Sequence, residues 1–242
     1  MPGAAKRKIS DYYAIRRRGG MGPPKRKYVR KYQPTPTRVL KENFEFKKVR
    51  YSRAFTVTVP AVGSSYEYVV SAASCHEPDL NPAAPHQPMN WDQYATFYGE
   101  YFVVGSKATL RSTWANTATG GGVYVSSGTV APVDGTSGDY WSSPGNAVEN
   151  GATTSILSGY TSTNGITSYS NYSANKYYGV STQDLRTKTD VVARTDATPI
   201  DNHQHVFRFE ALDTAASAKV NCLLTIEYMV CLMSTKRNRA QQ

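Results

Sequence analysis

The sequence VNCLLTIEYMVCL, residues 220–232, alternates apolar and polar side chains over 13 positions. Side chains of a β-strand point alternately to the two faces of a sheet, so this period predicts a long strand with one buried face. The opposite face is partly apolar, which leaves open that a neighbouring subunit covers it. The buried positions are expected to be Val220, Cys222, Leu224, Ile226, Tyr228, Val230 and Leu232.

The same alternation recurs in residues 53–59, 107–114 and 205–211. In the last of these we expect Phe207 and Phe209 to point inward and Arg208 to point outward. Shorter strands are predicted at residues 66–71, 101–104 and 122–126.

One helix is predicted over residues 90–98. Asn90 is a favourable N-cap residue, and Gln93 stands three positions later, as in a capping box. Three aromatic side chains then fall on one helical face, namely Trp91, Tyr94 and Tyr98.

Residues 115–202 have a different composition, with 44 of 88 positions occupied by Gly, Ser, Thr or Asn. We interpret this stretch as long surface loops joined by short strands, such as 123–125 and 191–194. Many strands, long loops and one short helix predict an all-β fold, a single jelly-roll β-sandwich that occupies residues 42–242.

Residues 1–41 form a basic arm that carries 13 Lys and Arg but one acid, a net charge of +12. The other residues carry 15 basic and 17 acidic side chains, a net charge of −2. So concentrated a positive charge predicts a polyanionic ligand. Gly and Pro spacers and like-charge repulsion lead us to expect that the free arm is disordered.

The candidate nucleic-acid-binding residues are the clustered cations and two interleaved tyrosines, whose rings could stack on exposed bases. A solubility tail or a targeting segment would explain the same charges, and the basic triplets also fit nuclear localisation signals. The residues are Lys6, Arg7, Lys8, Arg16, Arg17, Arg18, Lys25, Arg26, Lys27, Arg30, Lys31, Tyr28 and Tyr32.

Other kinds of site find little support in the sequence. Three cysteines at wide spacing argue against a disulfide framework and a zinc finger, and favour a reducing compartment. His203 and His205 are spaced as a possible metal pair, but no supporting ligand follows, so we interpret them as ordinary strand residues. No nucleotide-binding or hydrolase motif is present. We therefore expect no enzymatic activity, no cofactor, no metal and no membrane insertion.

Two segments resemble a known family. WDQY at residues 91–94, with FY at 97–98 and YFVVGSK at 101–107, resembles an aromatic helix that runs into a strand with a Gly-Ser-Lys turn between. LTIEYMV at 224–230 is similar to the last strand of the same jelly roll. The family is the capsid proteins of small circular single-stranded DNA viruses that encode a replication initiator, the circovirus-like group.

The resemblance implies a small icosahedral shell of sixty copies (T=1). The arm would face inward onto a circular single-stranded DNA genome, and the loops would face outward. It also implies recognition by host nuclear import receptors, assembly in the nucleus and a final location in the virion; the host-cell receptor is not specified.

Two other functions compete with this hypothesis. The first is a nuclear or ribosome-associated nucleic-acid-binding protein whose β-sandwich reads the ligand directly, which the −2 charge of the body disfavours. The second is a β-sandwich lectin or adhesin, which the missing signal peptide disfavours.

Overall fold

The computed structural model describes seven stretches of the body, all within Glu42–Gln242. Every arm residue named above lies outside them. The described stretches are 44–60, 64–80, 86–115, 121–131, 141–158, 165–212 and 218–235.

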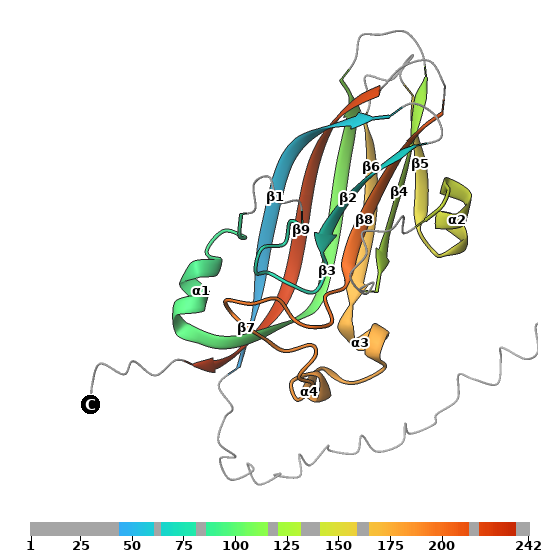
Figure 1. The fold of residues 1–242 in the computed structure, drawn as a ribbon. Coiled ribbons are helices and arrows are strands. Elements are labelled where there is room, and N and C mark those ends of the chain that lie inside the picture. Colours follow the sequence, from blue (N-terminus) through green and yellow to red (C-terminus); the bar gives the residue numbers. More distant parts are fainter. Residues whose placement is uncertain are drawn as a thin grey trace, which may run out of the picture. The chain divides into compact units, whose positions relative to one another are not determined.

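Two antiparallel sheets face each other as a sandwich (Figure 1). Sheet A has the order β1 (Glu45–Val59), β9 (Ala218–Thr235), β3 (Tyr98–Trp114) and β6 (Ile166–Ser173), with β7 (Ala193–Arg194) also paired to β3. Sheet B has the order β2 (Ser65–Ser71), β8 (Gln204–Ala211), β4 (Gly122–Val130) and β5 (Thr153–Ser158).

The strand order is that of a jelly roll. When the two-residue β7 is set aside, the first strand pairs with the last, the second with the next to last, and so inward to β4 with β5. Such nested pairing arises when a long hairpin wraps around itself to make two sheets. The predicted fold class is confirmed.

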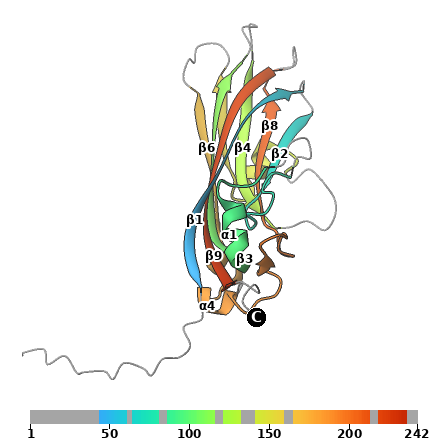
Figure 2. The same cartoon turned by 90° about the vertical axis from the view of Figure 1, so that its left-hand side faces the viewer.

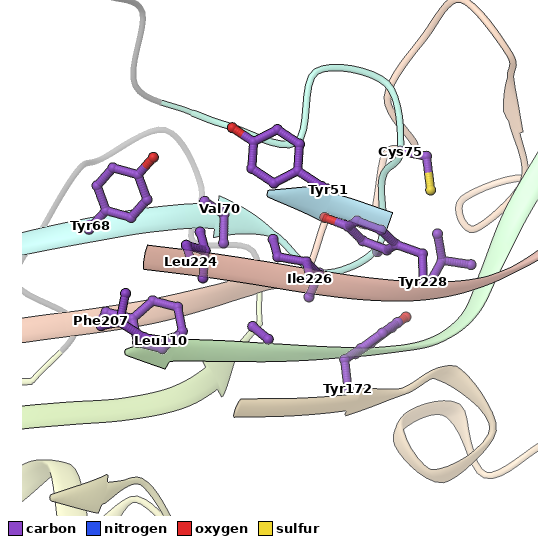
Figure 3. Close-up of a cluster of buried hydrophobic side chains, with 14 of the residues drawn as sticks. Tyr51, Tyr68, Val70, Cys75, Leu110, Tyr172, Phe207, Leu224, Ile226 and Tyr228 are labelled. Atoms are coloured by element: carbon purple, nitrogen blue, oxygen red, sulfur yellow. The ribbon is translucent and has the colours of Figure 1, made fainter. Parts of the chain in front are cut away.

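Strand β9 lies at the centre of sheet A. It pairs with β1 from Glu45↔Leu232 to Val59↔Ala218, and with β3 on its other side. All seven side chains expected to be buried are at most 4% exposed, so the predicted period is confirmed. Figure 3 shows Leu224, Ile226 and Tyr228 of this strand in the buried cluster.

The expected Gly-Ser-Lys turn after residue 104 is wrong, because β3 runs unbroken through it. The pairing register with β9 shifts between Val103 and Gly105, which makes Val104 the extra residue of a β-bulge. A glycine suits the next position, since a Cβ atom on Gly105 would lie 3.0 Å from the Tyr172 carbonyl oxygen. The bulge absorbs the irregularity while the strand pairing continues.

Helix α1 (Trp91–Phe97) is confirmed, but the predicted cap is wrong. Asn90 adopts a left-handed conformation with φ of 66°, and its side chain caps nothing. The helix is instead fixed by Trp91, whose Nε1 donates to the Thr195 carbonyl at 3.1 Å and whose ring packs edge-on against Tyr101. Helix α1 lies against β3, as the rotated view in Figure 2 shows.

The loop-rich interpretation of residues 115–202 missed several elements. Besides β5 and β6, its described parts contain α2 (Pro144–Glu149), α3 (Ala174–Tyr178) and α4 (Thr182–Leu185), so the expectation of one helix is wrong. Each of these short helices begins after a serine that caps it. Strand β6 was hidden because its buried face carries Ser168 and Ser170 in place of apolar side chains.

Arg208 points away from the sandwich interior, as expected, but it is not exposed. Its guanidinium donates to the carbonyls of Trp141 and Ser142 and pairs with Glu67 at 3.4 Å and Glu210 at 3.2 Å. These bonds hold the segment that enters α2 over the outer face of sheet B, where α2 lies against β4 and β5 (Figure 1). Part of the outer side of sheet B is thereby covered, whereas Ile156 of β5 remains exposed.

A buried polar cluster joins the two sheets around His205 of β8. Its Nε2 lies 2.9 Å from the Ser106 hydroxyl of β3, and its Nδ1 lies 2.7 Å from the Ser170 hydroxyl of β6. Ser106 donates onward to the Ala72 carbonyl at 2.6 Å, so the imidazole donates to Ser106 and accepts from Ser170. The ring is neutral in this arrangement, and its burial lowers the pKa of His205 from 6.5 to about 3.

Acid should therefore weaken the fold. Between pH 6.5 and pH 3, His205 is protonated in the unfolded chain but stays neutral in the folded one. The free energy of unfolding therefore has its full value above pH 6.5 and decreases as the pH falls toward 3. At pH 5 this loss is about 2 kcal/mol. Urea titrations at pH 7 and pH 5 should show it, and the His205→Gln variant should lose about 2 kcal/mol less than the parent. Equal losses in the two proteins would contradict this assignment.

A second buried cluster forms around Asp79, whose carboxylate is fully buried and paired with Arg53. Tyr51 donates to it at 3.2 Å and Tyr68 at 2.7 Å, so side chains from β1 and β2 converge on one anion. The Asp79 carboxylate therefore links strand β1 of sheet A to strand β2 of sheet B.

Replacing Asp79 by Ala should lower the free energy of unfolding by about 3–5 kcal/mol, because Arg53 keeps its charge without this partner. The matched control is Asp196→Ala, which breaks the exposed pair with Arg194 and should cost less than about 1 kcal/mol. Denaturant titration of both variants measures the difference, and a similar cost for both would refute the role given to Asp79.

Candidate nucleic-acid interface

We call the outward-facing side chains of β1 from Phe46, β3 from Lys107, β6, and β9 up to Met229 the open face of sheet A. Its charged side chains are all exposed, and five of the six are basic. They are Lys48, Arg50, Lys107, Arg111, Lys219 and Glu227. The body is acidic as a whole, but this surface has a net charge of +4.

Strand pairing arranges the face in rows. Arg50, Glu227 and Lys107 are direct neighbours across β1, β9 and β3. The next row consists mainly of hydroxyls, with Ser52 and Thr225 bonded to each other at 3.0 Å. The face therefore offers cations together with neutral hydrogen-bonding groups, the mixture that contacts sugars and phosphates.

Glu227 is the one acid on this surface. Its Oε1 lies 2.5 Å from Arg50 Nη2, and this hydrogen bond, followed by the charges of Arg50, Lys48 and Lys107, lowers the pKa of Glu227. The carboxylate stays ionised and neutralises one of three nearby cations. Because both partners are exposed, the pair adds little to stability, and its main effect is on the surface charge.

A shallow depression of about 220 Å³ lies beside the bulge of β3. It is smaller than pockets that enclose small-molecule ligands, roughly 300–1,000 Å³. Its lining combines two lysines with the carboxylate and suits a small anionic group better than an enclosed ligand. The lining residues are Lys48, Gly105, Ser106, Lys107, Glu227, Tyr228 and Met229.

Exposed aromatic rings flank the cations on two sides. Tyr169 of β6 is 48% exposed, and Lys107 Nζ lies 4.9 Å from the centre of its ring. Phe46 is 46% exposed and precedes Lys48 by two residues on the same side of β1, where its ring packs edge-on against Phe44. Arg186 lies over the Phe44 ring at 4.3 Å.

The predicted binding residues of the arm lie outside the described residues, so their assignment stays a prediction. Sequence reasoning missed the open face because it summed charge over the body. The available signal was alternation: Lys48 and Arg50 are two residues apart, and Lys107 and Arg111 are four apart in a segment already predicted as a strand.

Other candidate chemistry is limited in the described stretches. No group of three or more His, Cys, Asp or Glu side chains there could hold a metal ion. The three cysteines are free and buried. Within the same stretches, no helix has the length and apolar character needed to cross a bilayer.

Comparisons with known proteins give distant likenesses. No protein-family model matches the chain, and no curated protein does. Among solved structures, the 60-mer BFDV capsid protein is 11% identical with a TM-score of 0.44, over 83% of this chain and 98% of that one. Cocksfoot mottle virus is 13% identical with a TM-score of 0.44 (80% and 97%), and Desmodium yellow mottle tymovirus is 16% identical with a TM-score of 0.37 (87% and 99%). These neighbours are viral capsid proteins, and the fold assignment of this chain rests on its own strand order.

Neutralising Glu227 tests whether the open face attracts polyanions. Glu227→Gln frees Arg50 for one more phosphate, so binding to single-stranded DNA should tighten. The slope of log affinity against log salt should steepen by about 0.7. Asp190→Asn removes the same charge from an exposed site off the face and should leave the slope unchanged. Fluorescence anisotropy across a salt series measures both variants, and identical slopes would exclude the open face as a contact.

Proposed function

We propose that this protein is the subunit of a viral capsid. Copies of the chain assemble into a small icosahedral shell, of sixty copies (T=1), and package a circular single-stranded DNA genome through residues 1–41. The observation that carries the proposal is the position of a +12 segment directly before the first strand of a jelly roll. The resemblance of residues 91–107 and 224–230 to circovirus-like capsid proteins supports the DNA cargo and the shell size.

The arm performs packaging by electrostatics. Each phosphate neutralised by Lys or Arg releases condensed counterions, so binding is strong and independent of sequence. Sixty arms of +12 would bring about 720 positive charges, which matches a genome on the order of a thousand nucleotides or a few times more. Tyr28 and Tyr32 would add stacking with unpaired bases.

The same basic clusters suit nuclear import. Short runs such as Lys6-Arg7-Lys8 and Lys25-Arg26-Lys27 have the composition that import receptors bind. The chain would therefore pass through the host nucleus before it becomes part of the virion.

Exposed apolar side chains support assembly with copies of the chain. Met89, just before α1, is 80% exposed, and Phe97, the last residue of α1, is 65% exposed. Burying such side chains is the usual source of stability in subunit contacts. We assign the surface around α1 to a contact with a neighbouring copy.

The open face favours one alternative, a nuclear or ribosome-associated nucleic-acid-binding protein that remains a monomer. In that case the β-sandwich alone would hold the ligand, and no particle would form.

Electron microscopy of the full-length protein at low and high salt separates the two functions. Uniform shells are expected, and their diameter gives the copy number. A chain that lacks residues 1–41 should keep the circular dichroism spectrum of the β-sandwich but lose packaged nucleic acid, seen as a fall in the 260 to 280 nm absorbance ratio of purified material. A monomer in every condition by light scattering would overturn the capsid proposal and favour the alternative.

A further inference from the structure

The two sheets present different outer surfaces. The segment anchored by Arg208 and helix α2 covers part of sheet B, where Trp141 packs with Ala147 and Ala152 on Val206. In sheet A, the outward-facing positions from Lys48 to Thr58 on β1 and from Lys107 to Thr113 on β3 remain accessible. Five accessible cations are therefore gathered on one surface, the open face of sheet A.

The cations on that surface are spread over three strands. Lys48 and Lys107 lie on strands separated by β9, about 10 Å apart across the sheet, and Arg111 lies about 13 Å further along β3. Glu227 attracts Lys48 and Lys107, and none of these three cations forms a salt bridge with another described residue. Spread charges without dedicated partners suit a chain of phosphates better than one compact anion.

The exposed rings indicate the form of the ligand. Phe46 and Tyr169 lie on the two outer strands of sheet A. Along the strands, Lys48, Arg50 and Lys107 lie between the rows that contain these two rings. Unpaired bases can stack on such rings while phosphates meet the cations, whereas a duplex keeps its bases paired and stacked inside. Rings and cations on one surface therefore favour a single strand.

The arm and the open face are close in sequence. The arm ends at residue 41, and Phe46 lies five residues later, at the start of β1 and two residues before Lys48. A nucleic-acid strand bound to the arm is therefore present near the open face at a high effective concentration. Contacts that are weak alone then become significant in the full chain.

From these observations we infer that the open face of sheet A is a second binding site for single-stranded nucleic acid, with its own stacking positions at Phe46 and Tyr169. The inference rests on the proposed function for the identity of the cargo. The inference assigns nucleic-acid binding to the body, although its net charge of −2 had disfavoured this. The net charge was misleading because it includes acidic residues that lie away from the open face.

The test compares three charge-matched variants of the full-length protein. The face variant is Lys48→Gln, Lys107→Gln and Arg111→Gln, and the arm variant is Arg16→Gln, Arg17→Gln and Arg18→Gln. The control removes three exposed cations elsewhere on the body, with Lys176→Gln, Lys188→Gln and Arg194→Gln. Anisotropy with a labelled dT30 strand over a salt series gives the slope for each, and circular dichroism confirms the fold.

The face and arm variants should each flatten the slope by about 2, and the control should not. A face variant that behaves like the control overturns this inference while the arm effect keeps the proposed function. An arm variant without effect counts against packaging by the arm, whatever the face does.

A second variant tests stacking. Phe46→Leu with Tyr169→Leu should weaken binding of dT30 by roughly tenfold or more, and should leave an abasic strand of equal length and a 30-base-pair duplex unchanged. Tyr124→Leu on sheet B is the aromatic control. Equal loss on the abasic strand would show that the rings do not stack on bases and would refute this part of the inference.

Discussion

The pairing of β9 with β1 and β3 is the interaction on which the rest of the molecule depends. Its even-numbered side chains from Val220 to Leu232 fill the sandwich, and its odd-numbered ones up to Met229 form the middle of the open face. A slip of one residue would bring Asn221 and Glu227 into the core and expose Ile226 and Tyr228. The cost of burying that carboxylate fixes the register, so one strand sets both the core and the placement of surface charge.

The sequence allowed the long strands to be predicted because their buried faces are apolar. It did not reveal β6, since Ser168 and Ser170 are small enough to lie under the other sheet and Ser170 is bonded to His205. The N-cap at Asn90 failed for another reason: burial of Trp91 outweighed local capping. At both places tertiary contacts determined the local structure, and such contacts cannot be read from a local sequence pattern.

Sequence reasoning missed the open face because it considered only the net charge of the whole body. Charge over the whole body is a property of composition, whereas binding depends on which side chains share a face. Alternation within β1 and β3 was enough to place the cations on one side, but the pairing of both strands with β9 was needed to bring them together. Arg208 shows the converse, because a segment far away in sequence covers a cation that alternation placed outside.

The bulge at Val104 has a consequence for how this chain can change in evolution. Before it, the odd residue Val103 points into the core; after it, the odd residue Lys107 points to the open face. The extra residue inverts the parity of the strand. Loss of one residue at the bulge would leave a regular strand in the same register with β9, so that Leu110 would still face the core and Arg111 the open face. The bulge accommodates one extra residue while the pairing on both sides of it continues, so homologous chains can differ by one residue here and keep both faces of β3 in place.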